Sequence, residues 1–313
     1  MSRMLRLLVV GSMNMDLVLQ TDRIPAPGEN RMGEAYSYLP GGKGANQAVA
    51  AARLGAEVFL VARVGRDANG RKLCRGLKAE GITTKFVSVD PASPSGLAVV
   101  LVEDSGQNRI LVYPGANMKL TVDEVGTALR DEYEAVLLQL EVPDAVVAAS
   151  VRTARQKRVP VILDAGPARP FDLKLLDGID ILSPNQSEAE ALTGLPCENA
   201  AEAEKAARRL RTLSAARHIV IKMGAAGAFL LTDGASELVP AFQVQAVDPT
   251  AAGDSFTAGL ALEWLRTGDL RRAVRYGNAA GALSAMTIGA QPSLPSAAEV
   301  EDFLARNCPN ITG

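Results

Sequence analysis

Histidine and cysteine are scarce in this chain of 313 residues, and their scarcity excludes several kinds of site. His218 is the single histidine, so a metal site built from several histidines is excluded. It stands at the start of an apolar run that predicts a strand, where a structural role is favoured over a catalytic one. Cys74, Cys197 and Cys308 lie far apart and form no Cys-x-x-Cys pair, so neither a zinc site nor a disulfide framework is predicted. Thiols of this kind are typical of a reducing compartment, and we expect a cytoplasmic protein.

The chain also lacks an excess of charge and any long apolar run. Lys and Arg number 33 and Asp and Glu 35, so the net charge of −2 gives no electrostatic reason to expect nucleic acid or an acidic membrane as a partner. No apolar segment approaches the roughly 18 residues that can cross a bilayer. The apolar run at 7–10 is too short for a signal peptide and is followed at once by Asn14 and Asp16. We interpret it as a first buried strand.

Short runs rich in Val, Ile and Leu alternate with amphipathic segments. The runs are continuous, as in strands buried on both faces, and alternation with helices predicts a parallel sheet. We therefore expect an α/β fold with a doubly wound, mostly parallel sheet between two helical layers (αβα). The expected strands are 7–10, 58–61, 135–139, 159–163, 179–182 and 218–222. The expected helices are 45–54, 69–80, 122–130, 144–156, 202–213, 254–266, 270–286 and 297–306.

Two regions, 14–38 and 95–113, break this alternation and read as alternating strands. Gly106, with Asp104 and Ser105 before it, suits a hairpin turn between the last two of these strands. We infer a small β-sheet that projects from the body as a lid and covers the site; the alternative is an ordinary continuation of the main sheet. The chain has no repeat and no obvious linker, so we expect a single domain over 1–313. The expected lid strands are 17–19, 35–38, 97–102 and 109–113.

The segment 247–256, Val-Asp-Pro-Thr-Ala-Ala-Gly-Asp-Ser-Phe, places a turn of small residues directly before Asp254 and an apolar, helix-like run behind it. A tight turn lets successive N–H groups point into one space, and with the positive end of a helix they suit a transferring phosphoryl group. A carboxylate there can take the proton of a hydroxyl that attacks phosphorus. Asp before a helix is also a common N-cap residue, and the segment alone leaves both interpretations open.

The segment 40–48, Pro-Gly-Gly-Lys-Gly-Ala-Asn-Gln-Ala, brings Lys43 and Asn46 to the start of a helix among three glycines. Glycine permits close approach of a ligand to the backbone, and the polar side chains suit a ligand rich in hydroxyls, such as a sugar. A flexible turn ahead of a helix is the alternative. The Walker A spacing is absent, and no strand is followed by G-x-G-x-x-G, which argues against a nicotinamide dehydrogenase.

In these two segments the chain resembles the PfkB-type carbohydrate kinase family, with 41–48 similar to its sugar-binding signature and 248–254 to its catalytic signature. The similarity continues through 11–16, 27–29, 139–141, 184–188 and 289–293. This order and spacing are specific for the family and less specific for the sugar. The resemblance implies ATP-dependent phosphorylation of D-ribose at the O5 hydroxyl to give ribose 5-phosphate. The alternatives are a kinase for deoxyribose, a ketose, a nucleoside or a sugar acid, or a sugar-binding regulator without catalysis.

The resemblance also implies a role for individual residues. Asp254 would be the general base, beside an anion hole formed by the backbone of Ala252, Gly253 and Asp254 itself. Asp16 would accept two vicinal hydroxyls, and the Asn14 amide would favour ribose over deoxyribose because it has a hydroxyl to satisfy. The residues expected to hold the sugar are Asn14, Asp16, Gly42, Lys43, Asn46, Glu141 and Asp254.

Glu141 ends an apolar strand at the edge where α/β sheets bind ligands, although a helix-entry acid is an alternative for it. The residues expected to bind ATP are Asn185, Lys222, Gly224, Gly227, Gly253 and Asn278. Lys222 departs from the small or hydroxyl residue usual in the family, so its side chain could meet a phosphate or point outward.

Two kinds of metal ion are implied. Glu188 would act on Mg²⁺ through water, although the N-x-x-E spacing from Asn185 is also that of a capping box and both can hold. The residues that match the family's monovalent cation site, taken as K⁺, are Asp248, Thr250, Ser284, Thr287, Gly289 and Ser293. Pro249 replaces the more usual Thr, which removes a backbone donor and fixes one torsion, so the strength of the cation effect stays open. The resemblance further implies a homodimer paired through the lid.

Overall fold

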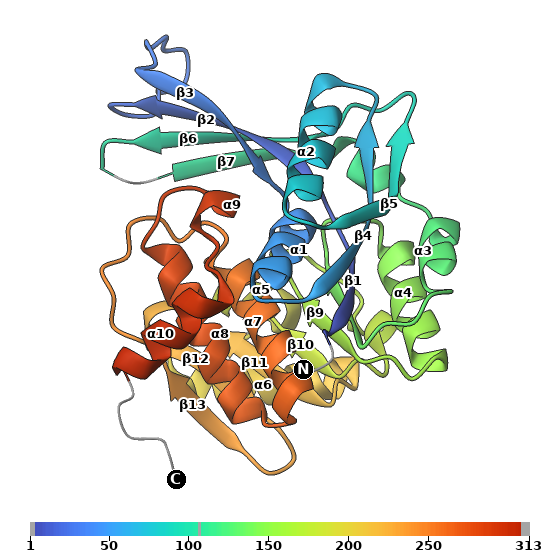
Figure 1. The fold of residues 1–313 in the computed structure, drawn as a ribbon. Coiled ribbons are helices and arrows are strands. Elements are labelled where there is room, and N and C mark those ends of the chain that lie inside the picture. The colour runs from blue at the N-terminus through green and yellow to red at the C-terminus, as the bar shows by residue number, and fades with distance from the viewer. Residues whose placement is uncertain (1–3, 106–107, 308–313) are drawn as a thin grey trace.

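The computed structural model describes residues 4–105 and 108–307. Within these residues a nine-stranded sheet forms the body, and its strands run in one direction except for the strand next to one edge, which pairs antiparallel with both of its neighbours (Figure 1). Its order is β13 (Ser236–Pro240), β12 (Gly227–Leu231), β11 (His218–Lys222), β10 (Ile181–Ser183), β9 (Val161–Asp164), β8 (Ala135–Gln139), β1 (Arg6–Val10), β4 (Glu57–Gly65) and β5 (Thr83–Asp90). This confirms the predicted α/β sheet.

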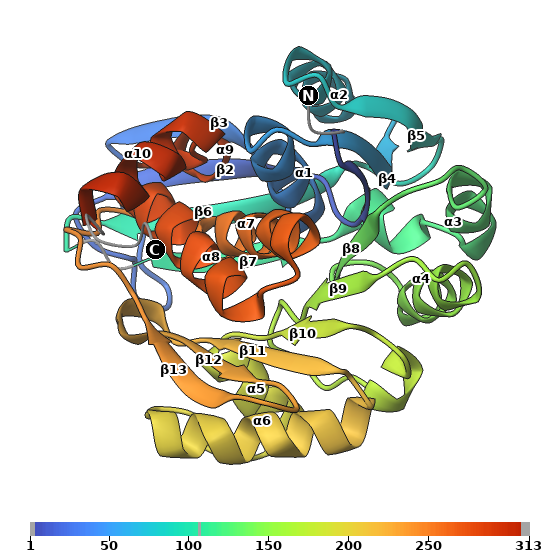
Figure 2. The ribbon, with the colours of Figure 1, turned by 60° about the horizontal axis from the view of Figure 1, so that its bottom comes forward.

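Helices cover both faces of this sheet (Figure 2). Because successive side chains of a strand point to opposite faces, Leu7 and Val9 join the core on one side of the sheet and Leu8 and Val10 the core on the other. One layer contains α1 (Lys43–Arg53), α2 (Ala68–Ala79), α7 (Ala252–Thr267), α8 (Leu270–Ala285) and α10 (Ala297–Asn307). The other contains α3 (Val122–Ala128), α4 (Asp144–Gln156), α5 (Gln186–Thr193) and α6 (Ala200–Ser214).

A second, four-stranded sheet projects from the body as the predicted lid, at the upper left of Figure 1. Its order is β3 (Ala35–Gly41), β2 (Asn14–Thr21), β6 (Gly96–Glu103) and β7 (Asn108–Tyr113). The central strands β2 and β6 pair in parallel, so the two lid segments meet through strands far apart in the chain. The short helix α9 (Ala290–Ser293) contacts β3 and lies below the lid. Of the predicted hairpin turn, Gly106 lies outside the described residues.

The sequence missed three strands of the main sheet. β5 is a partly exposed edge strand, and β12 and β13 form an antiparallel hairpin at the other edge. β5 and β13 lie at the two edges and lack the continuous apolar runs of doubly covered strands. β12 is buried on both faces, and its short run Gly-Ala-Phe-Leu-Leu was overlooked. The predicted runs 159–163 and 179–182 lie slightly early, because the strands there begin at Val161 and Ile181. No helix in the described part of the chain is long and apolar enough to cross a membrane.

Candidate active site

The candidate residues gather where the carboxyl ends of the central strands face the beginnings of α1 and α7. Parallel strands end at the same edge of a sheet, so Glu141 after β8, Asp164 at the end of β9 and Lys222 at the end of β11 reach one region. Helix α1 packs against α7 and brings Asn46 to Asp254, with the Asn46 amide nitrogen 2.9 Å from the Asp254 carboxylate. The segments expected to bind the sugar and to carry the catalytic acid therefore meet.

Asp254 is a buried acid of the first helical turn, 4% exposed, and does not cap the helix. The cap position of α7 belongs to Ala251, and the Asp254 carboxylate instead accepts hydrogen bonds from the side-chain amides of Asn46 and Gln47, the latter at 3.1 Å. Burial raises the pKa of Asp254 to about 6, with Asp164 adding to the rise while Lys43 and the two amides oppose it. Such a carboxylate accepts a proton near neutral pH.

The turn before Asp254 leaves two backbone donors facing the site. Ala251 adopts a left-handed conformation with φ 63°, which is rare for a residue other than glycine and lets α7 begin abruptly. The amides of Gly253 and Asp254 donate to no acceptor in the part of the chain that the structure describes. The amide of Ala252, by contrast, donates to the Pro249 carbonyl at 3.1 Å. Of the three amides expected at an anion hole, those of Gly253 and Asp254 are thus free to meet an anion, and that of Ala252 is engaged within the turn.

Asp16 and Asn14 face the site from lid strand β2. Burial raises the pKa of Asp16 to about 7, and the charges of Glu141 and Asp254 contribute to the rise. A side chain at Gly41 would collide with the Asp16 carboxylate, so glycine there leaves the acid its place. A side chain at Gly42 would lie 2.6 Å from the Asn14 backbone nitrogen, and the φ of 88° at Gly42 also favours glycine.

Asn14 is oriented by Asn117, a residue that the sequence analysis missed. The Asn117 side-chain nitrogen donates to the Asn14 side-chain oxygen at 2.7 Å, while its oxygen accepts from the Met13 backbone at 2.9 Å. The Asn14 amide therefore presents its nitrogen, a hydrogen-bond donor, to the site.

Glu141 lies beside the start of α1. Its carboxylate accepts hydrogen bonds from the Ser12 hydroxyl and, at 3.2 Å, from the Lys43 backbone amide. It also adds its charge to the surroundings of Asp16. Glu141 thus acts as an anchor for the glycine-rich segment, in addition to the sugar contact expected of it.

The Lys43 side chain lines a polar cavity of about 520 Å³. The sequence predicted only a contact of Lys43 with the sugar. The Lys43 ammonium lies 3.8 Å from Asp164 and 4.0 Å from Asp254. Burial acts to lower the pKa of Lys43, but the surrounding carboxylates dominate and hold it above its usual range. The cavity is also lined by Asn185 and Glu188, which together form a capping box at the start of α5. The two roles considered for this pair are therefore compatible in space.

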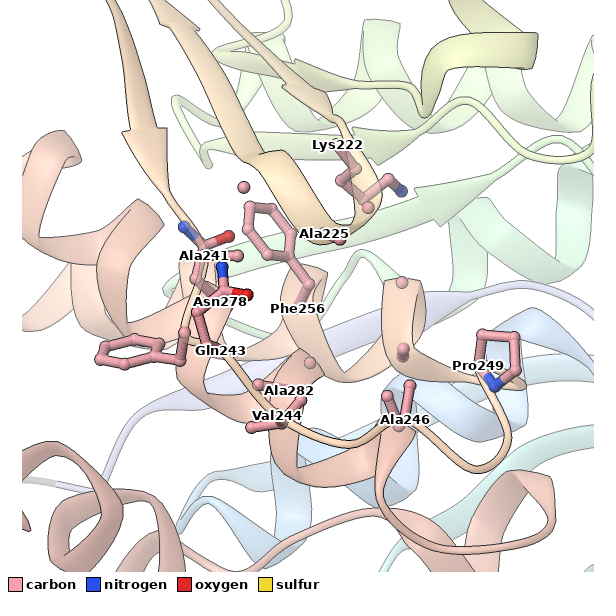
Figure 3. A pocket seen from close by; sticks show the side chains of 17 residues that line it. Lys222, Ala225, Ala241, Gln243, Val244, Ala246, Pro249, Phe256, Asn278 and Ala282 are labelled. Carbon is pink, nitrogen blue, oxygen red and sulfur yellow. The ribbon is translucent and has the colours of Figure 1, made fainter. Parts of the chain in front are cut away.

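A second cavity, of about 250 Å³, lies beside the turn that leads into α7. It is bounded by α8 and by the loops that follow β11 and β13. Figure 3 shows Phe256, Asn278 and Lys222 around it. The predicted Gly224 and Gly227 also line it. Two backbone carbonyls hold the Asn278 amide nitrogen at 3.1 Å each, which leaves its oxygen as an acceptor. A largely apolar slot with one polar end suits a nucleotide base.

The six residues expected at the monovalent cation site form two hydrogen-bonded groups, and these groups meet where the Asp248 amide donates to the Ala285 carbonyl, next to Ser284, at 3.1 Å. Asp248 joins two loops, because its carboxylate accepts from the Thr250 amide at 2.9 Å and from the Gly289 amide at 2.8 Å. Ser284 and Ser293 share a hydrogen bond of 2.8 Å between their hydroxyls, and the Thr287 amide donates to the Ser284 carbonyl at 3.2 Å. Among the described residues no group of three or more His, Cys, Asp or Glu is placed to hold a metal ion. A cation here would therefore depend mainly on carbonyl and hydroxyl oxygens.

Asp164 and Gln47 were also missed by the sequence analysis. The Gln47 side-chain nitrogen donates both to Asp164, at 2.9 Å, and to Asp254, so one amide joins two buried acids. A signal was available for Asp164, since it is an acid directly after a buried apolar run. Gln47 gave no signal beyond its place beside Asn46.

With Asp16 as the expected sugar ligand, its raised pKa predicts a pH dependence of sugar binding. An acceptor of two hydroxyl protons must be ionised, so we expect KM for the sugar to be lowest above about pH 7 and to rise as the pH falls through that value. Initial rates over a pH series measure this, and an Asp16→Asn variant, which carries no titrating group there, serves as control. An equally steep rise of KM in that variant would assign the effect to another group.

Comparisons with known proteins identify the family. The model of the pfkB family of carbohydrate kinases matches residues 4–297. A ribokinase of Haemophilus influenzae is 37% identical over 300 residues, which cover 95% of this chain and 98% of the relative. A deoxyribokinase of Salmonella typhi is 34% identical over 302 residues, covering 96% and 98%. The structure of Arabidopsis thaliana ribokinase complexed with ribose and ATP superposes with a TM-score of 0.88 at 34% identity, covering 96% of this chain and 99% of that one. The expected family is confirmed: this chain belongs to the pfkB family of carbohydrate kinases.

Proposed function

We propose that the chain transfers the terminal phosphoryl group of ATP to the O5 hydroxyl of D-ribose, with Asp254 as general base. The observation that carries this proposal is the position of the Asp254 carboxylate, which is buried beside the sugar-side amide of Asn46 and beside the free backbone amides of the α7 turn. The names of the ribokinase relatives support ribose as the substrate.

In the proposed reaction the hydroxyl proton passes to Asp254 as the O5 oxygen bonds to phosphorus, and the bond from phosphorus to the ADP oxygen breaks. The amides of Gly253 and Asp254 and the Lys43 ammonium offset the negative charge on the phosphoryl oxygens. Asn14 and Asp16 hold the sugar hydroxyls, which aligns O5 with the phosphorus. The lid over the site excludes water, which would otherwise hydrolyse ATP.

ATP would place its base in the apolar slot between Phe256 and Asn278 and its phosphates in the polar cavity with Asn185. Mg²⁺ prefers few carboxylates together with water and phosphate oxygens, and Glu188 in that cavity fits such an ion. When bound, Mg²⁺ would offset charge on the phosphates.

K⁺ would sit against the connected loops at Asp248 and Gly289 and fix the turn that leads into α7. The cluster of carbonyl and hydroxyl oxygens with one carboxylate suits a large monovalent cation. The turnover in K⁺ compared with that in a choline salt of equal ionic strength tests this, and equal rates would contradict it.

A panel of sugars in a coupled ADP-release assay tests the substrate. We expect the highest kcat/KM for ribose, and a higher value for any other sugar would overturn the assignment. Deoxyribose is the second candidate because a deoxyribokinase is among the relatives. The free donor of Asn14 favours ribose if it meets the 2-hydroxyl, since a site built to hold a hydroxyl discriminates strongly against an analogue that lacks it.

Filling the apolar slot should weaken ATP binding selectively. Ala282 lines the slot from α8, and Ala282→Leu adds bulk where the base would lie. We expect KM for ATP to rise about tenfold or more, with little change in KM for ribose, because lost contacts and steric conflict cost a few kcal/mol. Kinetics with each substrate varied measure this. If KM for ATP and KM for ribose rose by the same factor, the nucleotide base would have to bind outside this slot.

We also propose that a second copy of the chain covers the outer face of the lid. The inner face carries Asp16, Val18 and Val100, so the alternate residues point outward. Register aligns Tyr38, Leu17, Val99 and Leu111 in one row across the four strands. A large apolar face on a projecting sheet is typical of a protein interface.

The lid proposal predicts that Leu111→Asp separates the copies, since Leu111 is 76% exposed and its replacement would place a charge in an apolar contact. Sedimentation of the two proteins at equal concentration measures this, and an unchanged mass would contradict it. Thr127→Asp, on the distant helix α3, is the control.

The cytoplasmic assignment stays a proposal, supported by Cys74 and Cys197, which form no disulfide; the third cysteine, Cys308, lies outside the described residues.

A further inference from the structure

A second acid lies beneath the proposed base and is held by two lysines. Asp164, fully buried at the end of β9, accepts a hydrogen bond from the Lys222 ammonium at 2.6 Å. Its other carboxylate oxygen accepts from Gln47 at 2.9 Å and lies 3.8 Å from the Lys43 ammonium. The same Gln47 nitrogen donates to Asp254, so a single amide group separates the two carboxylates.

Lys222 does not point outward. Its side chain is only 11% exposed, and a side chain built at Gly253 would lie 3.7 Å from its nitrogen. Lys222 therefore stands between the slot for the base and the cavity for the phosphates, and it lines both. The backbone of Lys222 is held in place, because its amide donates to the Pro184 carbonyl at 2.8 Å. A lysine that could have met solvent thus turns into the protein to reach Asp164.

Among the four residues Asp164, Asp254, Lys43 and Lys222 the charges balance, while Glu141 and Glu188 also act on Lys43. Asp164 and Asp254 carry two negative charges, and Lys43 and Lys222 carry two positive charges. Lys43 lies near both acids, whereas Lys222 reaches only Asp164 by direct contact. An unpaired charge in a buried site acts strongly on its neighbours, since the low polarity of the interior screens it poorly. Removing either member of the Asp164–Lys222 pair would therefore change the electrostatic potential at Asp254.

We propose that Asp164 and Lys222 form a charge-matched positioning pair that sets how readily Asp254 accepts the proton of the attacking hydroxyl. The pair acts through Gln47 and through the field at Asp254, so neither residue needs to react. This inference rests on the proposed role of Asp254. The groups that face Asp254 are Lys43 from α1, Asp164 from β9 and Asp16 from β2, and the balance among them determines its protonation.

At low pH, kcat/KM falls as Asp254 becomes protonated, and this fall is the acid limb of the pH profile. We expect the two single substitutions in the pair to move the acid limb in opposite directions. Lys222→Met leaves Asp164 with less compensation, which favours the protonated form of Asp254 and moves the limb about one pH unit toward alkaline values. Asp164→Asn removes a negative charge and moves the limb about one pH unit toward acid values. The double variant, which loses both charges, should return the limb to within a few tenths of a unit of the original.

Controls separate this effect from simple loss of structure. Lys222→Arg keeps the charge and should keep the limb in place. Lys85 and Asp131 form an ion pair of 2.7 Å on the surface, so Lys85→Met and Asp131→Asn make a matched pair of substitutions that should leave the limb unmoved. If both single variants at 164 and 222 lose activity or stability while the limb stays fixed, or if both shift it in the same direction, the proposal is wrong.

A direct titration keeps this test independent of the proposed reaction. In protein labelled at its aspartate carboxyls, NMR follows the ionisation of Asp254, whose signal is assigned by its loss in Asp254→Asn. The same opposite displacements and their cancellation are expected. A wild-type protein without sugar-dependent ADP release would refute the proposed function, while the titration would still decide the pair. Unchanged ionisation of Asp254 in both single variants would overturn the pair itself.

Discussion

Asp254→Asn is expected to lower kcat by about 10³-fold while sugar binding persists, because a positioned general base contributes a factor of roughly 10² to 10⁴. An amide has nearly the shape of the carboxylate but cannot take the proton of the attacking hydroxyl. The two backbone donors of the turn remain, so some transfer continues. Steady-state rates and calorimetric titration with ribose measure the two quantities separately.

The fold of this variant should survive, and the reason lies in Asn46. The side-chain oxygen of Asn46 is buried without a hydrogen-bond partner among the described residues. If the Asn46 amide rotates, that oxygen can accept from the side-chain amide introduced at position 254, which replaces the lost contact. Asp123→Asn, in the exposed first turn of α3, is a control for the same chemical change. A turnover within tenfold of the wild type in Asp254→Asn would refute the general base.

Asp16→Asn is expected to raise KM for ribose by about 10²- to 10³-fold. The proposed carboxylate accepts two sugar hydroxyls, and each hydrogen bond to a charged group contributes roughly 1.5 to 3 kcal/mol. An amide offers only one acceptor and no charge. KM for ATP should change little, because Asp16 lies on the lid strand β2 and lines neither the apolar slot nor the phosphate cavity.

The stability of this variant gives a second measurement. The pKa of Asp16 is raised to about 7 by burial and by the charges of Glu141 and Asp254, so its ionised form is disfavoured in the folded protein. Neutral Asn should therefore leave the free energy of unfolding near neutral pH unchanged or increase it. A KM for ribose that rises less than tenfold would show that Asp16 does not hold the sugar.

By itself, the sequence determined the central strands of the main sheet and the two signature segments. The strands β8 and β11 and the helix α4 occur at the predicted residues, because continuous runs of Val, Ile and Leu and the helical period are local properties of the chain. The segments that contain Asn46 and Asp254 could also be recognised from the sequence, because small residues and polar side chains at fixed spacing form a local pattern.

Only the tertiary structure decided which charged and polar side chains pair around Asp254. Asp164, Gln47 and Asn117 act through contacts with residues more than a hundred positions away, and no local pattern encodes such a contact. The inward direction of Lys222 depends on Asp164 at the end of β9, which is separated from β11 by β10 in the sheet. Local sequence specifies the period and the turns of a chain, whereas the pairing of buried charges depends on which strand ends the folded sheet brings to the same edge.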